Sequence, residues 1–89
     1  MVGHPLVSVI VPAFNAQHYI ERTIKSVLDQ SYMNIELIIV DDGSNDRTLD
    51  VIAKTVGDEP RTRVISQSNK GVSAARNKGI EQSEGKFLV

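Results

Sequence analysis

The fold is decided by the stretch IELIIVDDGS at residues 35–44, where a mostly apolar run leads directly into two acids, a glycine and a serine. A short apolar run of this kind is typical of a strand buried on both faces, as in a parallel sheet. The residues DDGSN at 41–45 favour turns and the starts of helices. We therefore predict a strand over residues 35–40 that ends in two carboxylates.

The segment before this strand predicts another strand and a helix. A β-branched run at residues 6–11 indicates a buried strand that stops at Pro12. A helix over residues 16–30, with Asn15 as its cap, follows from apolar residues spaced at i, i+4, i+7 and i+8, namely Ile20, Ile24, Val27 and Leu28.

The segment after residue 44 continues the alternation between short apolar runs, typical of strands, and apolar residues at helical spacing. It predicts a helix over residues 48–56 closed by Gly57, a strand over 63–66, a helix over 72–82 and a strand over 86–89. Strands that alternate with helices imply right-handed crossovers and a parallel sheet. The expected fold is a three-layer, Rossmann-like α/β sheet in the order β-α-β-α-β-α-β, with a tail at residues 1–5 and one partial domain at residues 6–89.

Composition excludes several classes of function. The 89 residues carry a net charge of -1, with no basic run that would mark a nucleic-acid groove, so we expect no nucleic-acid partner. The lack of cysteine removes disulfides, thiolate catalysis and cysteine-type zinc sites, and suits a cytoplasmic location. His4 and His18 have no partner at metal spacing, so no metal site is expected in this chain.

Three segments reach the same rim of the predicted sheet, at residues 12–16, 41–45 and 67–73. Ligands of such sheets bind in the crevice beyond the carboxyl ends of the strands. The segment PAFN at residues 12–15 stands where a dinucleotide oxidoreductase would have its glycine-rich turn, and no P-loop pattern occurs in the chain. Both of those nucleotide-binding classes are therefore excluded.

Asp41 and Asp42 are candidates for reading a nucleotide base. Adjacent residues at a strand end face opposite sides, so one acid can face the crevice while the other faces the next helix. A carboxylate accepts a hydrogen bond from uracil N3–H, whereas cytosine presents an acceptor at that position. The alternative, which the residues alone leave equally open, is that these acids only support the turn and the following helix.

The segment NKGVSAARNKG at residues 69–79 is a candidate for phosphate binding. Gly71 and Ser73 at a helix start, with Lys70 beside them, offer backbone N–H groups and a cation to a diphosphate. Arg76 lies one turn further along and has a guanidinium suited to phosphate. From the residues alone, a capped helix with solvated basic side chains is the favoured alternative.

Three motifs together resemble the start of the family 2 glycosyltransferases with the GT-A fold: VSVIVPAFN at residues 7–15, SYMNIELIIVDDGS at 31–44 and NKGVSAARNKG at 69–79. By this resemblance Asp42 contacts the uracil, and Asp41 lines the same region. The implied nucleotide-binding set consists of Pro12, Ala13, Phe14, Asn15, Asp41, Asp42, Gly71 and Arg76.

The resemblance also implies a reaction for the complete protein. It is the inverting transfer of a sugar from a nucleoside diphosphate, with UDP favoured, to the hydroxyl of a saccharide or lipid-linked saccharide. A divalent cation, Mg or Mn, neutralises the departing diphosphate while a carboxylate takes the acceptor's proton. Family members carry the metal motif just after a strand that resembles EGKFLV at residues 84–89, so neither metal ligands nor catalytic residues are expected in this chain.

We therefore expect this chain to be the nucleotide-binding part of a longer enzyme of cell-surface polysaccharide biosynthesis, cytoplasmic or peripheral to the membrane. On its own it is expected to be inactive, and to self-associate through the unpaired edge of its last strand. Two other classes use similar folds. A non-catalytic nucleotide-binding or assembly module stays open, and a receiver-type signalling domain is disfavoured because its third strand would end in an acid, where this chain has Ile65-Ser66-Gln67.

Overall fold

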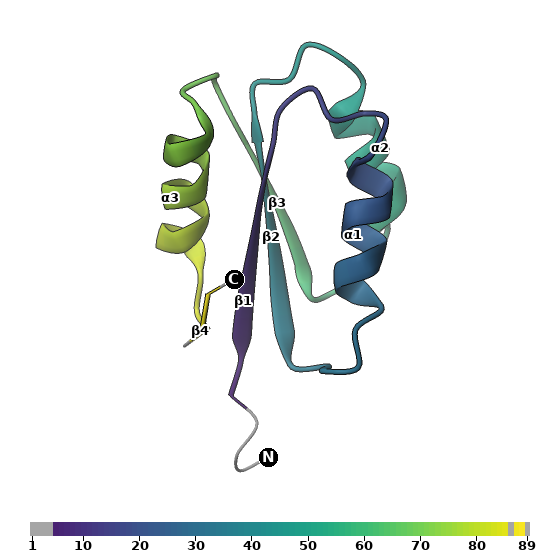
Figure 1. Ribbon diagram of the computed structural model, residues 1–89, viewed down its shortest axis with the longest axis vertical. Coiled ribbons are helices and arrows are strands. Elements are labelled where there is room, and N and C mark those ends of the chain that lie inside the picture. The colour runs from purple at the N-terminus through teal and green to yellow at the C-terminus, as the bar shows by residue number, and fades with distance from the viewer. Residues whose placement is uncertain (1–4, 86, 89) are drawn as a thin grey trace.

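The computed structural model describes residues 5–85 and 87–88, which form a three-layer α/β/α arrangement. Every strand pairing is parallel, and the strand order across the sheet is β3-β2-β1-β4. Helices α1 and α2 lie on one side of the sheet and α3 on the other (Figure 1). The elements are β1 (Val7–Ala13), α1 (Ile20–Leu28), β2 (Ile35–Asp42), α2 (Thr48–Val56), β3 (Thr62–Gln67), α3 (Val72–Gln82) and β4 (Phe87–Leu88). This is the predicted Rossmann-like fold, and β4 lies beside β1.

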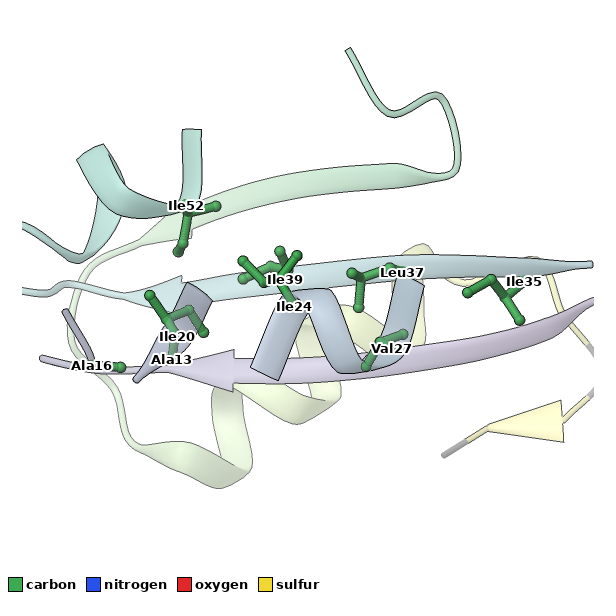
Figure 2. Packing of buried hydrophobic residues seen from close by; sticks show 9 residues of the cluster. All are labelled: Ala13, Ala16, Ile20, Ile24, Val27, Ile35, Leu37, Ile39 and Ile52. Atoms are coloured by element: carbon green, nitrogen blue, oxygen red, sulfur yellow. The ribbon is translucent and has the colours of Figure 1, made fainter. Parts of the chain in front are cut away.

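The central strand β2 is buried on both faces, because its alternate residues enter two different cores. Leu37 and Ile39 pack in the larger core, beneath α1 and α2. Figure 2 shows the other members of this cluster around them, from the strands and from the two helices. Ile38 and Val40 face the opposite side, where they form the smaller core with Ile10 of β1 and Ala75 of α3.

The expected end of the first strand at Pro12 is wrong, because β1 runs through Pro12 to Ala13. Proline is tolerated in a strand where its missing N–H removes no ladder bond. Pro12 pairs with Val40 of β2, whereas the described part of β4 pairs only with Val7 and Ser8. At the level of Pro12, β1 is therefore paired on its β2 side alone in the part of the chain that the structure describes.

The expected helix over residues 16–30 is also wrong at both ends, since α1 spans Ile20–Leu28. Residues 17–19 form turns, and the residue before the helix, Tyr19, provides no side-chain cap. Asn15 does not cap the helix, because its Oδ1 accepts a hydrogen bond from the N–H of Asn45 at 2.8 Å. Asn15 therefore contacts a loop 30 residues further along the chain and not the start of the nearby helix.

The remaining elements lie close to their predicted positions. Helix α2 ends before Gly57, which has a φ of 55°, and α3 has the predicted limits. Strands β2 and β3 extend slightly beyond the predicted runs. The described part of the last strand is Phe87–Leu88; the other residues of that prediction, Lys86 and Val89, lie outside the described residues.

Candidate functional site

A pocket of about 210 Å³ opens at the carboxyl ends of β1 and β2, next to the start of α3. The end of β1 supplies an apolar wall that finishes with Phe14, which is 43% exposed. The end of β2 supplies one carboxylate, that of Asp42. The lining residues are Pro12, Ala13, Phe14, Asp42, Asn69, Gly71 and Val72. The three segments predicted to share this rim therefore do meet there.

The side chain of Asp42 is hydrogen-bonded to the segment that precedes α3. Its Oδ1 accepts the Gln67 side-chain amide at 2.9 Å and the backbone N–H of Lys70 at 2.8 Å. Its Oδ2 accepts the Asn69 side-chain amide at 3.1 Å and the backbone N–H of Gly71 at 2.9 Å. The hydrogen bond from Gln67, followed by that from the Lys70 N–H, holds the pKa of Asp42 below its ordinary value. The carboxylate is therefore ionised at neutral pH.

These hydrogen bonds correct the expected use of the Gly71 backbone. The Gly71 N–H was expected to face a diphosphate, and it instead donates to Asp42, as does the neighbouring Lys70 N–H. A carboxylate offers about four acceptor positions, and the four protein donors occupy them. Asp42 thus joins β2 to the segment before α3, and it is also one of the residues that line the pocket.

Asp41 faces the other side of the sheet, as expected for the neighbour of Asp42. It is fully buried and does not line the pocket. Its two oxygens accept the backbone N–H of Ser44 at 3.1 Å and the Ser44 hydroxyl at 2.5 Å. Its contacts support the turn that leads to α2, which was the alternative that the sequence left open.

Asn15 and Arg76 are not among the residues that line the pocket. Asn15 is exposed and has a φ of 49°, in the left-handed region that asparagine tolerates better than most residues. Arg76 is exposed on α3, one turn after Val72. Of the eight residues predicted to bind nucleotide, the structure gathers five in the pocket lining: Pro12, Ala13, Phe14, Asp42 and Gly71.

Three residues of the site were not in that predicted set. Asn69 and Val72 line the pocket, and Gln67 donates to Asp42. Gln67 ends β3 and pairs in register with Asp42. Polar residues at the ends of neighbouring parallel strands meet at one edge, so its position at a strand end was the available signal. Val72 gave no such signal, since an apolar residue that opens a helix is ordinarily packed.

The carboxylates of Asp41 and Asp42 do not fit a metal ion. Within residues 5–85 and 87–88, no three histidine, aspartate or glutamate side chains gather as metal ligands. The oxygens of Asp41 and Asp42 accept hydrogen bonds from Ser44 and from the segment before α3, respectively. Magnesium and manganese bind carboxylate oxygens as ligands, and these oxygens are already engaged in hydrogen bonds with the protein.

The chain belongs to glycosyl transferase family 2, whose family model matches residues 8–89. The putative teichuronic acid biosynthesis glycosyltransferase TuaG of Bacillus subtilis is 46% identical to it over 96% of the chain. An uncharacterized glycosyltransferase of Haemophilus influenzae is 41% identical over the same share. The chain spans 34% of the length of each of these two relatives.

Solved glycosyltransferases share the fold. S. aureus TarS in complex with UDP-GlcNAc superimposes with a TM-score of 0.81 at 31% identity, over 93% of this chain and 25% of that one. The Pyrobaculum calidifontis mannosyltransferase PcManGT, in complex with GDP-Man and Mn2+, gives a TM-score of 0.89 over 98% of this chain and 27% of that one. At 24% identity the second likeness concerns the fold alone. The fold is thus the nucleotide-binding half of a GT-A domain.

Proposed function

We propose that this chain forms the donor-nucleotide pocket of a glycosyltransferase that uses a UDP-linked sugar and transfers it, with inversion, to an acceptor hydroxyl. The observation that carries the proposal is the pocket itself, where the apolar Pro12–Phe14 wall lies opposite an ionised Asp42. A flat base with a polar edge matches such a pocket. The likeness to S. aureus TarS, which was solved with UDP-GlcNAc, supports a uridine nucleotide.

The base is proposed to rest against Phe14 with its N3–H directed at Asp42. Because protein donors occupy the acceptor positions of that carboxylate, the base has to replace one of them. Asn69 is the donor that yields, since its side chain lines the pocket and belongs to an exposed residue, whereas the Lys70 and Gly71 N–H groups are fixed in the backbone. A base that presents an acceptor at this point, as cytosine does, gains nothing from the exchange.

The other parts of the reaction are assigned on the family pattern. Arg76 is proposed to reach the phosphates from α3, where its exposed side chain is free of the pocket wall. On the family pattern, the Mg or Mn ion and the catalytic base are assigned to parts of the complete enzyme other than the described residues. By itself the chain is expected to bind a donor nucleotide and to transfer no sugar. The acceptor is proposed to be a saccharide or lipid-linked saccharide.

Cellular location and assembly complete the proposal. None of the helices within the described residues is long and apolar enough to cross a membrane. We place the enzyme in the cytoplasm or at the membrane surface, where a cell-surface polysaccharide would be built. Self-association through the β4 edge of the sheet stays a prediction.

Phe14→Ala tests the proposed base site. This substitution is expected to weaken UDP binding about tenfold, because stacking on an aromatic ring contributes about 1–3 kcal/mol per base. Folding should change little, since the ring is 43% exposed. Isothermal titration of the purified chain with UDP measures the effect, and Met33→Ala is the matched control because Met33 is a 65% exposed apolar residue outside the pocket lining.

The proposal predicts wild-type affinity for Met33→Ala and reduced affinity for Phe14→Ala. Equal affinities in the two variants would place the base elsewhere. A wild-type chain that binds no UDP at millimolar concentration would contradict the proposed function itself.

A further inference from the structure

Two carboxylates that do not touch the pocket each hold a hydroxyl against the loop that carries Phe14. In the first set, Asp41 accepts the hydroxyl proton of Ser44, and the Ser44 oxygen accepts the backbone N–H of Asn15 at 2.9 Å. In the second, Asp46 accepts the hydroxyl proton of Thr48, and the Thr48 oxygen accepts the backbone N–H of Ala16 at 2.7 Å. We call these two sets the carboxylate–hydroxyl relays.

Each relay orients its hydroxyl in one direction. A serine or threonine hydroxyl has a single proton, and when that proton is donated in a hydrogen bond to the carboxylate, only the lone pairs of the hydroxyl oxygen remain for other partners. Those lone pairs face the N–H groups of Asn15 and Ala16, which immediately follow Phe14. The second relay is the more protected from water, because Thr48 is fully buried and Ala16 is 1% exposed.

Further hydrogen bonds join the loop after β1 to the loop after β2. They restrict the conformation of the segment on which the relays act. Gln17 donates its N–H to Asp46 at 3.4 Å and accepts the N–H of Arg47 at 2.9 Å. Asn15, held in its left-handed conformation, accepts the N–H of Asn45. A non-glycine residue keeps such a conformation only where its surroundings fix it.

We infer that the two relays are positioning elements for the nucleotide pocket: Asp41–Ser44 and Asp46–Thr48 fix residues 15 and 16 and thereby hold the Pro12–Phe14 wall where it meets the base. This inference rests on the proposed function. It gives Asp41 a positioning role, whereas the family resemblance had placed this residue among those that line the nucleotide region. It also assigns a role to Ser44, Asp46 and Thr48, none of which lines the pocket.

Thr48→Val tests the buried relay with a side chain of nearly the same shape and no hydroxyl. It leaves the Ala16 N–H without its acceptor, so the loop has to be ordered when the nucleotide binds. We expect UDP affinity to fall about fivefold to tenfold, which corresponds to the loss of one buried hydrogen bond. Thr48→Ser keeps the hydroxyl and should restore the wild-type affinity.

Ile24→Val is the control for a general loss of stability. Ile24 is fully buried in the core beneath α1, and its shortening destabilises the fold without touching either relay. It should leave the UDP dissociation constant unchanged. An equal loss of affinity in Ile24→Val and Thr48→Val, or no loss in Thr48→Val, would overturn the inference. If Thr48→Val does not fold, Ser44→Ala, which breaks the other relay at a half-buried residue, gives the same comparison.

A second measurement separates this inference from the proposed function. Hydrogen exchange of the Ala16 amide, followed by NMR without nucleotide, should be slow in the wild type and in Ile24→Val and at least tenfold faster in Thr48→Val. An Ala16 amide that exchanges equally fast in all three would overturn the inference. A chain that shows the expected exchange pattern but binds no UDP would contradict the proposed function and leave the relays intact as holders of the loop.

Discussion

Asp42→Ala is expected to lower UDP affinity about tenfold to a hundredfold and to remove the preference for UDP over CDP. The loss follows from the charge-assisted hydrogen bond between the carboxylate and the base N–H. The variant also leaves the N–H groups of Lys70 and Gly71 without their acceptor, so the segment before α3 loosens. Isothermal titration with UDP and with CDP measures both effects.

The ratio of the two affinities is the decisive quantity, because a partly unfolded variant loses UDP and CDP binding in equal proportion. Asp50→Ala is the matched control, since it removes the same charge from an exposed position on α2 outside the pocket lining. It should keep the wild-type preference. If Asp42→Ala also keeps that preference, Asp42 is a structural link between β2 and α3 and does not read the base.

Gly43→Ala is expected to destabilise the fold by about 2–5 kcal/mol, the sum of a strained backbone and an overpacked contact. Gly43 has a φ of 74°, and a Cβ at this position would lie 2.6 Å from the backbone nitrogen of Asn69. The neighbouring atom belongs to the main chain and cannot rotate away. The segment from Asn69 to Gly71 would have to move, and with it the donors that hold Asp42. Denaturant unfolding followed by circular dichroism measures the loss.

Gly57→Ala separates the two contributions. Gly57 also has a positive φ, of 55°, but a Cβ there would meet no atom within 4 Å. Its substitution should destabilise the fold by only about 1–2 kcal/mol, the conformational part alone, and should not change UDP affinity. Equal losses of stability in the two variants would show that the contact between Gly43 and Asn69 contributes nothing.

The order of elements was predictable because it is encoded locally. The apolar run before Asp41 indicates a strand buried on both faces, and β2 indeed supplies residues to both cores. The alanine-rich stretch at residues 72–82 predicted a helix, and α3 has the same limits. Each of these features depends on neighbours in sequence, which is why a single sequence was sufficient.

The failures occurred where distant segments decide the outcome. Pro12 stays in β1, where it pairs with Val40 of β2, and Asn15 accepts a hydrogen bond from the Asn45 N–H in place of capping the helix. The use of the Lys70 and Gly71 N–H groups by Asp42 joins residues 28 and 29 positions apart in the chain. No local pattern specifies such pairs. The five pocket residues belong to the set that the family resemblance implied. Sheet geometry predicted only that their three segments meet, because the carboxyl ends of parallel strands lie at one rim.

The most direct test of the central claim is an NMR titration of the 15N-labelled chain with UDP, followed through the backbone amide signals. If the pocket at the ends of β1 and β2 holds the nucleotide, the amides of Ala13, Phe14, Asn69 and Gly71 should shift first and most, and the Lys70 N–H should keep its bond to Asp42. Shifts that instead gather around His18, Arg47 and Lys54, in a second pocket lined by the turn before α1 and by α2, would contradict the account.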